Sequence, residues 1–168
     1  PFFIPAVISN MAAGHISIRY GLKGPNYTLT SACASGAHAI GEAADYIRGG
    51  EFDIMFAGGT EGTVCPLAVG GFAAMKALST RNDQPTAASR PWDRDRDGFV
   101  LSEGCGMVIL EELEHALKRK ARIYGELTGY GYSSDGYHMT NPVPGGSGAA
   151  LAMRMALKDG MINTEDIG

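Results

Sequence analysis

The stretch Thr30-Ser31-Ala32-Cys33-Ala34-Ser35-Gly36 decides how the rest of the chain is interpreted. A β-prone run, 27–30, precedes it and a run of helix formers, 37–48, follows it, so the cysteine is predicted to lie where a strand passes into a helix. Backbone N–H groups at a helix N-terminus are unpaired and partly positive, and they stabilise a thiolate, the nucleophilic form of cysteine. The same turn can direct an N–H group at an oxyanion forming on a thioester carbonyl. The spacing therefore indicates Cys33 as a candidate nucleophile, with a buried structural cysteine as the alternative.

The composition is that of a globular protein. Of the 168 residues, 45% are hydrophobic and 19% are charged, and the length corresponds to about one domain. The formal charge of -4 argues against a nucleic acid partner, and no apolar run approaches the roughly 18 residues of a membrane span. The three cysteines, Cys33, Cys65 and Cys105, have no framework spacing. They predict a reduced, cytoplasmic protein without a structural metal.

Both ends of the sequence look truncated. The chain opens without Met on an apolar run, 1–4, and closes on a polar run, 163–168, that no further element follows. We therefore expect a piece of a larger protein, in which residues 1-168 form one partial domain and no second domain is present.

The alternation of strand and helix patterns predicts an α/β layered domain with a largely parallel sheet. Strands are expected at 27–31, 53–59, 105–110 and 123–132, and the second and third of these are apolar enough to be covered on both faces. Helices are expected at 5–20 with a break at Gly14, and at 34–48, 66–78, 111–122 and 146–158. Residues 80–98 are expected to form a polar loop.

Several polar motifs have simpler explanations than a ligand site. Asp93-Arg94-Asp95-Arg96-Asp97-Gly98 nearly opens a calcium loop, but its twelfth position is Gly104 and its arginines neutralise the carboxylates, so internal ion pairs are predicted. Gly145-Gly146-Ser147-Gly148 precedes a helix, and either an anion cradle or a flexible helix start explains it. Structural roles are predicted for the four histidines, His15, His38, His115 and His138.

A series of ordered motifs resembles a known family. Together they closely resemble the β-ketoacyl-[acyl carrier protein] synthases, most of all synthase II of bacterial fatty acid synthesis, and the resemblance covers essentially all 168 residues. Modular polyketide ketosynthases are the nearest relatives of that family. The motifs are Ala32-Cys33-Ala34-Ser35-Gly36, Ala57-Gly58-Gly59-Thr60-Glu61, Ala77-Leu78-Ser79-Thr80-Arg81-Asn82-Asp83, Ser89-Arg90-Pro91-Trp92-Asp93, Arg96-Asp97-Gly98-Phe99-Val100, Ser133-Ser134-Asp135 and Tyr137-His138-Met139-Thr140.

The resemblance implies a fold and a reaction. The fold is the thiolase-like layered fold, α-β-α-β-α in the complete homodimeric enzyme, of which this chain covers only part. The reaction is an acyltransferase reaction of fatty acid elongation, in which Cys33 takes an acyl chain from acyl carrier protein as a thioester. Malonyl-[acyl carrier protein] then loses CO2, and its carbanion attacks the thioester to give 3-oxoacyl-[acyl carrier protein]. The backbone N–H of Cys33 is implied as one oxyanion donor. No cofactor is implied, because the substrates are carried on phosphopantetheine.

Further site residues are implied by their match to family positions. Phe99 and Phe72 match family positions beside the nucleophile and along the acyl pocket, where Gly70 and Gly71 would leave room for the chain. Thr140 and Asn141 match the contact with the phosphopantetheine arm. Lys76 matches a basic position where the acidic carrier protein docks, for which electrostatic steering is the physical reason.

One departure from the family and three alternatives stay open. The family uses two further histidines, in a His-Gly-Thr motif and a Gly-His segment, and neither occurs here, so the isolated chain is expected to be inactive in condensation and to accept an acyl group at best. The alternatives are a polyketide ketosynthase, a non-catalytic partner resembling a chain-length factor, and a carrier-protein-binding module. The short motif at 32–36 and the run 137–140 favour fatty acid synthesis, and the presence of Cys33 disfavours a chain-length factor.

Overall fold

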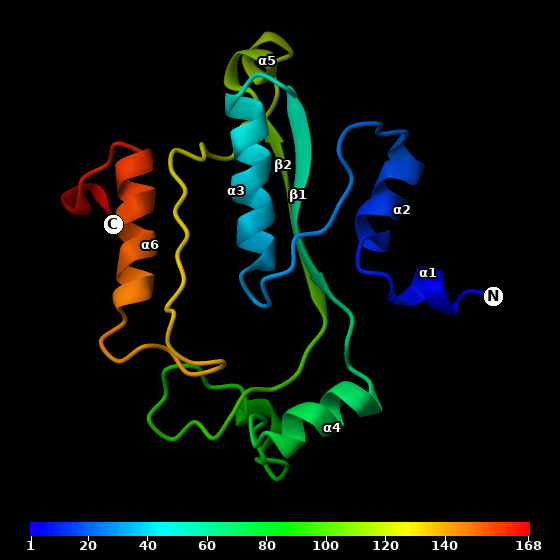
Figure 1. Cartoon of the computed structure of the whole chain (residues 1–168), viewed down its shortest axis with the longest axis vertical. Helices are drawn as coiled ribbons and strands as arrows, with labels where there is room; N and C mark the ends of the chain where they lie inside the picture. The colour runs from blue at the N-terminus through cyan, green and yellow to red at the C-terminus, as the bar shows by residue number, and fades with distance from the viewer. The chain divides into compact units, whose positions relative to one another are not determined.

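The computed structural model describes residues 1–168 and divides them into two compact units (Figure 1). The first unit comprises Pro1–Gly58 and Met107–Gly168, and the second comprises Gly59–Gly106. The second unit is therefore an insertion within the first. No helix is both long enough and apolar enough to cross a bilayer.

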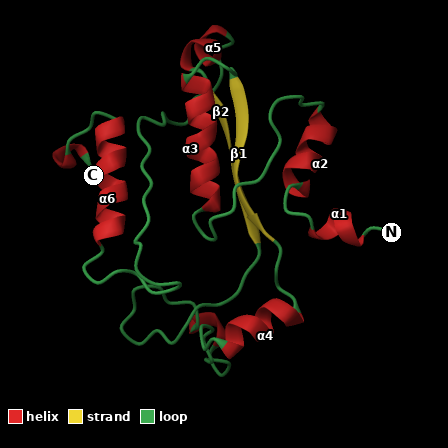
Figure 2. Ribbon diagram, viewed as in Figure 1, coloured by secondary structure: helices red, strands yellow, loops and turns green.

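The secondary structure is mostly helical (Figure 2). The helices are α1 (Phe3–Val7), α2 (Met11–Tyr20), α3 (Ser35–Arg48), α4 (Pro66–Ala74), α5 (Leu113–Lys118) and α6 (Ser147–Asp159), with short 3-10 turns at Pro85–Ala87 and Thr164–Asp166. The strands are β1 (Ile54–Glu61) and β2 (Gly104–Glu111). The predictions of helices near 34–48 and 146–158, and of strands near 53–59 and 105–110, are confirmed.

The two strands are hydrogen-bonded neighbours and run antiparallel. The N–H of Glu112, after the end of β2, donates to the carbonyl of Asp53, before the start of β1, at 2.9 Å. Toward the other end, the Thr60 hydroxyl donates to the carbonyl of Gly104 at 3.3 Å. The prediction of a largely parallel sheet is wrong for this pair, because the chain returns alongside the strand it has just left instead of crossing back to that strand's start.

The strands predicted at 27–31 and 123–132 are absent. Both segments are irregular, and only an isolated bridge between Ser31 and Cys33 lies near the first. A β-prone sequence becomes a strand only when a neighbouring strand accepts its backbone hydrogen bonds, and these two segments have no such neighbour in the chain.

Three helix boundaries also differ from the predictions. Gly14 lies inside α2 and does not break it, since one glycine costs a helix only about 1 kcal/mol. The helix expected at 66–78 ends at Ala74, and Lys76 follows with a left-handed φ of 55°. The helix expected at 111–122 covers only Leu113–Lys118, because Lys120 has a left-handed φ of 57°.

The buried hydrophobic side chains are all alanines, namely Ala43, Ala44, Ala57, Ala88 and Ala116. Large apolar side chains on the two strands stay accessible, as in Ile54 (41% exposed) and Ile109 (60% exposed). The prediction that both strands are covered on both faces is therefore wrong for this chain, although the Phe56 ring of β1 stacks on the Tyr20 ring of α2 with 6.3 Å between the centroids.

In the first unit, the extended segment 128–135 lies between α3 and α6 (Figure 1). A Cβ on Gly41 of α3 would lie 2.2 Å from the Tyr130 ring, and a Cβ on Gly131 would lie 2.2 Å from the carbonyl oxygen of Ala152 in α6. At the far end of the helices, Arg48 forms a 2.8 Å ion pair with Asp159, whose carboxylate also accepts the N–H of Tyr130 at 2.9 Å. Glycine thus permits the close approach, and the ion pair holds one end of it.

In the second unit, segments 77–80 and 97–99 lie side by side. The Phe99 N–H donates to the Ala77 carbonyl and the Ser79 N–H donates to the Phe99 carbonyl, both at 3.0 Å. The Asp97 carboxylate accepts the Ser79 hydroxyl at 2.6 Å and the Thr80 N–H at 3.0 Å. Side-chain and backbone bonds therefore fasten the same two segments together.

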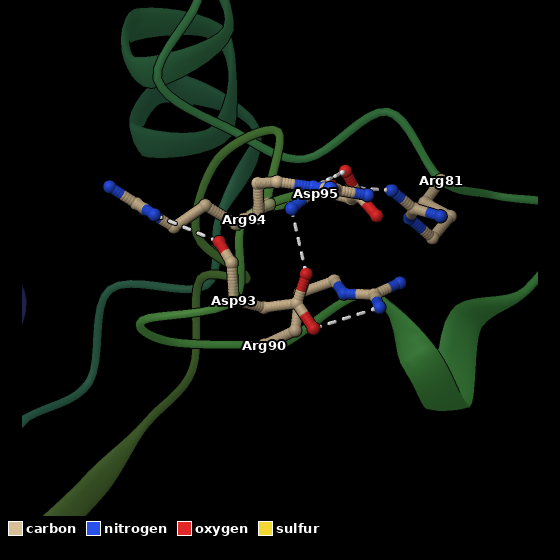
Figure 3. A network of polar contacts seen from close by, with 6 residues as sticks. Arg81, Arg90, Asp93, Arg94 and Asp95 are labelled. Atoms are coloured by element: carbon tan, nitrogen blue, oxygen red, sulfur yellow. Dashed lines mark hydrogen bonds and ion pairs between the residues drawn. The ribbon is translucent and has the colours of Figure 1, made fainter.

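The charged loop of this unit contains the predicted internal ion pairs (Figure 3). Arg90 pairs with Asp93 at 3.0 Å, and Arg94 pairs with Asp95 at 3.2 Å. The Arg81 guanidinium also donates to the Asp95 carbonyl at 2.8 Å. The prediction of a loop closed by its own arginines and aspartates is confirmed.

Candidate functional site

Cys33 lies in the turn that leads into α3. The N–H of Ser35, the first helical residue, donates to the carbonyl of Ala32 at 3.1 Å, which closes the turn around the cysteine. Ala32 has a φ of 51°, a left-handed conformation that a residue with a Cβ adopts only when its surroundings impose it. The Cys33 thiol is exposed, and the Cys33 N–H has no acceptor within the chain. The turn therefore presents both a thiol and a free N–H group beside a helix N-terminus.

Two serines and a histidine hold this turn. The Ser31 N–H donates to the Ser35 hydroxyl oxygen at 2.8 Å, and that hydroxyl donates to the Ala32 carbonyl at 2.7 Å. The Ser31 hydroxyl lies 2.6 Å from Nδ1 of His38, one turn further along α3. Sequence reasoning missed this cluster, although its members lie four and seven residues apart around the start of a predicted helix.

An open cleft of about 770 Å³ lies in the same unit, between the start of α3, the segment 130–139 and the start of α6. His38 lies on its wall and packs edge-on against the Tyr132 ring, with 6.1 Å between the ring centroids. Asp135 also lines the cleft, and its carboxylate accepts the N–H of Val143 at 3.0 Å, which ties the loop that precedes α6 to the extended segment. The cleft thus has apolar, hydroxyl and carboxylate groups on its walls.

The residues predicted to contact phosphopantetheine, Thr140 and Asn141, lie in the loop before α6 and are exposed. Their backbone N–H groups both donate to Nδ1 of His138, each at 3.1 Å. This histidine therefore shapes a loop, in agreement with the structural role predicted for it. No hydrogen bond joins Thr140 or Asn141 to Cys33.

The predicted acyl-pocket residues lie in the second unit. The Phe72 and Phe99 rings meet edge to face, with centroids 5.1 Å apart and an interplanar angle of 82°. Gly70 and Gly71 lie on α4 with no heavy atom within 4 Å of the position that a Cβ would take. Lys76 is exposed just beyond α4. The structure therefore brings the two aromatic residues into contact beside the open glycine face, whereas Cys33 belongs to the other unit.

Four carboxylates have lowered pKa values, among them those of Asp97 and Glu111. Hydrogen bonds from the Ser79 hydroxyl and the Thr80 N–H hold the pKa of Asp97 below its usual range. The Arg119 guanidinium, assisted by His115, lowers the pKa of Glu111 from 4.5 to about 2. Both carboxylates are therefore ionised partners of structural contacts. No group of three or more His, Cys, Asp or Glu side chains is placed to hold a metal ion.

The family follows from comparison with known sequences. The model of the "Beta-ketoacyl synthase, N-terminal domain" matches residues 1–116, and that of the "Beta-ketoacyl synthase, C-terminal domain" matches residues 124–168. The chain belongs to the β-ketoacyl synthase family. Its relatives include the 3-oxoacyl-[acyl-carrier-protein] synthase 2 of Vibrio cholerae, 55% identical over 100% of this chain and 41% of that protein. The corresponding protein of Coxiella burnetii is 55% identical over 99% of this chain and 40% of its own length.

Solved β-ketoacyl synthase structures have the same fold. A β-ketoacyl synthase from Burkholderia phymatum has a TM-score of 0.91 at 41% identity, and the match includes 98% of this chain and 40% of the Burkholderia chain. The AntDE:AntF complex, a type II polyketide carrier protein with its ketosynthase bound to the hexaketide, has a TM-score of 0.92 at 41% identity and covers 96% of this chain and 40% of its own. The predicted resemblance and the thiolase-like fold are confirmed. The chain spans about two fifths of the length of these relatives.

Proposed function

We propose that the protein to which these residues belong catalyses the decarboxylative condensation of an acyl thioester with malonyl-[acyl carrier protein], giving 3-oxoacyl-[acyl carrier protein] in fatty acid elongation. The observation that carries the proposal is the Cys33 turn, with its exposed thiol at the start of α3 after a left-handed Ala32. Membership of the β-ketoacyl synthase family supports the reaction class. The 55% identity to synthase 2 proteins supports the fatty acid pathway.

Cys33 is the nucleophile of the first half of the reaction. Its thiolate attacks the carbonyl carbon of the acyl-pantetheine thioester, a new C–S bond forms, and the pantetheine thiol leaves. The negative charge that develops on the carbonyl oxygen needs hydrogen-bond donors, and the free N–H of Cys33 is one of them. The product of this half-reaction is an acyl group held on Cys33.

The second half forms the carbon–carbon bond. Malonyl-[acyl carrier protein] loses CO2, and the electron pair of the broken C–C bond stays on the α-carbon. That carbon attacks the Cys33 thioester, the C–S bond breaks, and the Cys33 thiolate is regenerated. No redox step occurs and no cofactor is required, because phosphopantetheine arrives as part of each substrate.

The other site residues are assigned to binding. We propose that the Phe72–Phe99 pair bounds the acyl pocket and that Gly70 and Gly71 leave room for the chain, which the open space at their Cβ positions supports. Thr140 and Asn141 contact the pantetheine arm. Exposed Lys76 attracts the acidic carrier protein by its charge. The protein is proposed to act as a cytoplasmic homodimer, although relatives in Arabidopsis thaliana and Hordeum vulgare are described as mitochondrial and chloroplastic.

A polyketide ketosynthase is the second candidate. The 41% identity to the ketosynthase of the AntDE:AntF complex favours it, but that value is lower than the 55% identity to synthase 2 proteins. Product analysis distinguishes the two: saturated acyl substrates extended by one malonyl unit indicate fatty acid elongation, whereas repeated extension of unreduced products indicates polyketide synthesis. A non-catalytic chain-length factor is disfavoured by the exposed Cys33 thiol.

The deciding experiment is acylation followed by peptide mapping. The full-length protein is incubated with acyl-[acyl carrier protein] and digested, and the acylated cysteine is identified by mass spectrometry. We expect the acyl group on Cys33, and we expect Cys33→Ser to abolish both acylation and condensation. The variants Cys65→Ser and Cys105→Ser are matched controls, because both side chains are exposed and neither is proposed to react. Undiminished condensation by Cys33→Ser would refute the proposal.

Residues 1–168 alone are expected to accept the acyl group at most. The two histidine motifs used by the family for decarboxylation do not occur in them. A polypeptide of residues 1–168 that produced 3-oxoacyl-[acyl carrier protein] would contradict this expectation.

A further inference from the structure

The Cys33 turn contains a strained residue, and something must hold it. Ala32 has a φ of 51° although it carries a Cβ, and it directly precedes Cys33. Left to itself, such a residue relaxes to a negative φ, and the following residue then changes direction. The direction of the Cys33 side chain therefore depends on contacts that keep Ala32 in place.

Those contacts converge on Ser31. Its N–H is bonded to the Ser35 hydroxyl at 2.8 Å, and its own hydroxyl is bonded to Nδ1 of His38 at 2.6 Å. The Ser31 carbonyl also accepts the N–H of Ala34, the N-cap of α3, at 3.2 Å, so the backbone and the side chain of Ser31 are both bonded to the start of the helix. Ser35 also reaches Ala32, whose carbonyl accepts both its hydroxyl and its N–H. The bond to His38 is the attachment made by the Ser31 side chain, separate from the two that its backbone makes.

We propose that His38 is a positioning residue that, through its hydrogen bond to Ser31, holds the turn that directs Cys33. This inference rests on the proposed function in that Cys33 is taken as the nucleophile. His38 makes no hydrogen bond to the Cys33 thiol and takes no part in proton transfer. It lies half-buried on the walls of two cavities, packed edge-on against Tyr132, so its ring is held in a fixed orientation.

The test measures Cys33 reactivity directly. Each variant of the full-length protein is treated with iodoacetamide at one pH, and the alkylation rate of each cysteine is followed by peptide mapping. His38→Phe keeps a planar ring of similar size but cannot bond to Ser31, and we expect it to slow Cys33 alkylation about five- to tenfold, the effect of losing one hydrogen bond. His38→Asn keeps an acceptor near the Nδ1 position and is expected to restore most of the rate.

Three comparisons make the test specific. Cys65 and Cys105 are exposed in the same molecule and their rates should not change. His15→Phe, on the exposed side of α2, is the matched control for the substitution itself. Ser31→Ala combined with His38→Phe should slow Cys33 no more than either change alone, because both remove the same bond.

The inference is overturned if His38→Phe alkylates at the wild-type rate. It is also overturned if His38→Asn is as slow as His38→Phe, or if the rates of all three cysteines change together, which would indicate a general loss of structure. The assay requires no condensation, so its outcome is separate from that of the proposed function. Slow alkylation of Cys33 in His38→Phe, together with undiminished condensation by Cys33→Ser, would leave the positioning role intact and refute the function.

Discussion

The contact between the extended segment 128–135 and α6 predicts the effect of a single methyl group. A Cβ on Gly131 would lie 2.2 Å from the carbonyl oxygen of Ala152 and 2.5 Å from the nitrogen of Ala156. Ordinary van der Waals contact begins at about 3.4 Å, so Gly131→Ala requires the backbone of α6 to move away by roughly 1 Å. Helix backbone yields less readily than the end of a side chain.

Overpacking of this kind costs about 1–3 kcal/mol, and alanine recovers about 0.4–1 kcal/mol by restricting the unfolded chain. We therefore expect Gly131→Ala to lower the free energy of unfolding by about 1–2 kcal/mol. With an m-value near 2 kcal/mol/M, typical of small proteins in urea, the midpoint of urea unfolding falls by roughly 0.5–1 M.

Gly125→Ala is the matched control. Gly125 precedes the same extended segment, has no heavy atom within 4 Å of its Cβ position and does not have a left-handed φ. Its midpoint should equal or slightly exceed that of the wild type. The reasoning is refuted if the two variants unfold at the same urea concentration, because the close approach of α6 would then have no energetic effect.

Three further predictions concern other parts of the chain. Arg119 lowers the pKa of Glu111 from 4.5 to about 2, so the stabilisation by Glu111 is complete above about pH 4.5 and is lost as the pH falls to about 2. The midpoint of urea unfolding should therefore fall less across this pH range in Glu111→Gln than in the wild type. Equal falls in the two proteins would count against the pairing. Gly98→Ala should lower the free energy of unfolding by about 3 kcal/mol, because Gly98 has a φ of 144° and a Cβ there would lie 2.4 Å from the carbonyl carbon of Leu78. An unchanged urea midpoint would contradict this prediction. Lys76→Glu should raise KM for acyl-[acyl carrier protein] severalfold with kcat unchanged, and the difference should shrink at high salt; a salt-independent effect would rule out electrostatic steering.

Helices whose ends are marked by residues next to them in the sequence were predictable. The helix at Ser35–Arg48 is followed by Gly49 and Gly50, and the helix at Ser147–Asp159 is followed by Gly160, so both ends are marked by residues that favour turns. The segments 27–31 and 123–132 carry equally clear β-prone residues. They failed as predictions because a strand depends on a partner elsewhere, which no local pattern reports.

In the candidate site, too, features set by neighbouring residues were predictable and features set by distant contacts were not. The place of Cys33 before a helix follows from neighbouring residues and was predictable. The Ser31–His38 bond depends on two side-chain rotamers, and the left-handed φ of Ala32 depends on that bond and on Ser35 together. The bond from Ser79 to Asp97 depends on the path of an entire loop. Contacts of this kind become visible only in three dimensions.

The insertion of Gly59–Gly106 has a consequence for how such a protein diversifies. The chain leaves the first unit along β1 and returns along β2, and because these are paired strands its two points of departure are only about 5 Å apart. The segment Gly59–Gly106 is therefore an exchangeable cassette, because a longer or shorter segment attached at the same two adjacent points leaves the path of the remaining backbone unchanged. Phe72, Phe99 and Lys76 all belong to this cassette, and Cys33 does not. Exchange of this segment would therefore alter the proposed acyl-pocket and carrier-docking residues while leaving Cys33 and its turn in place.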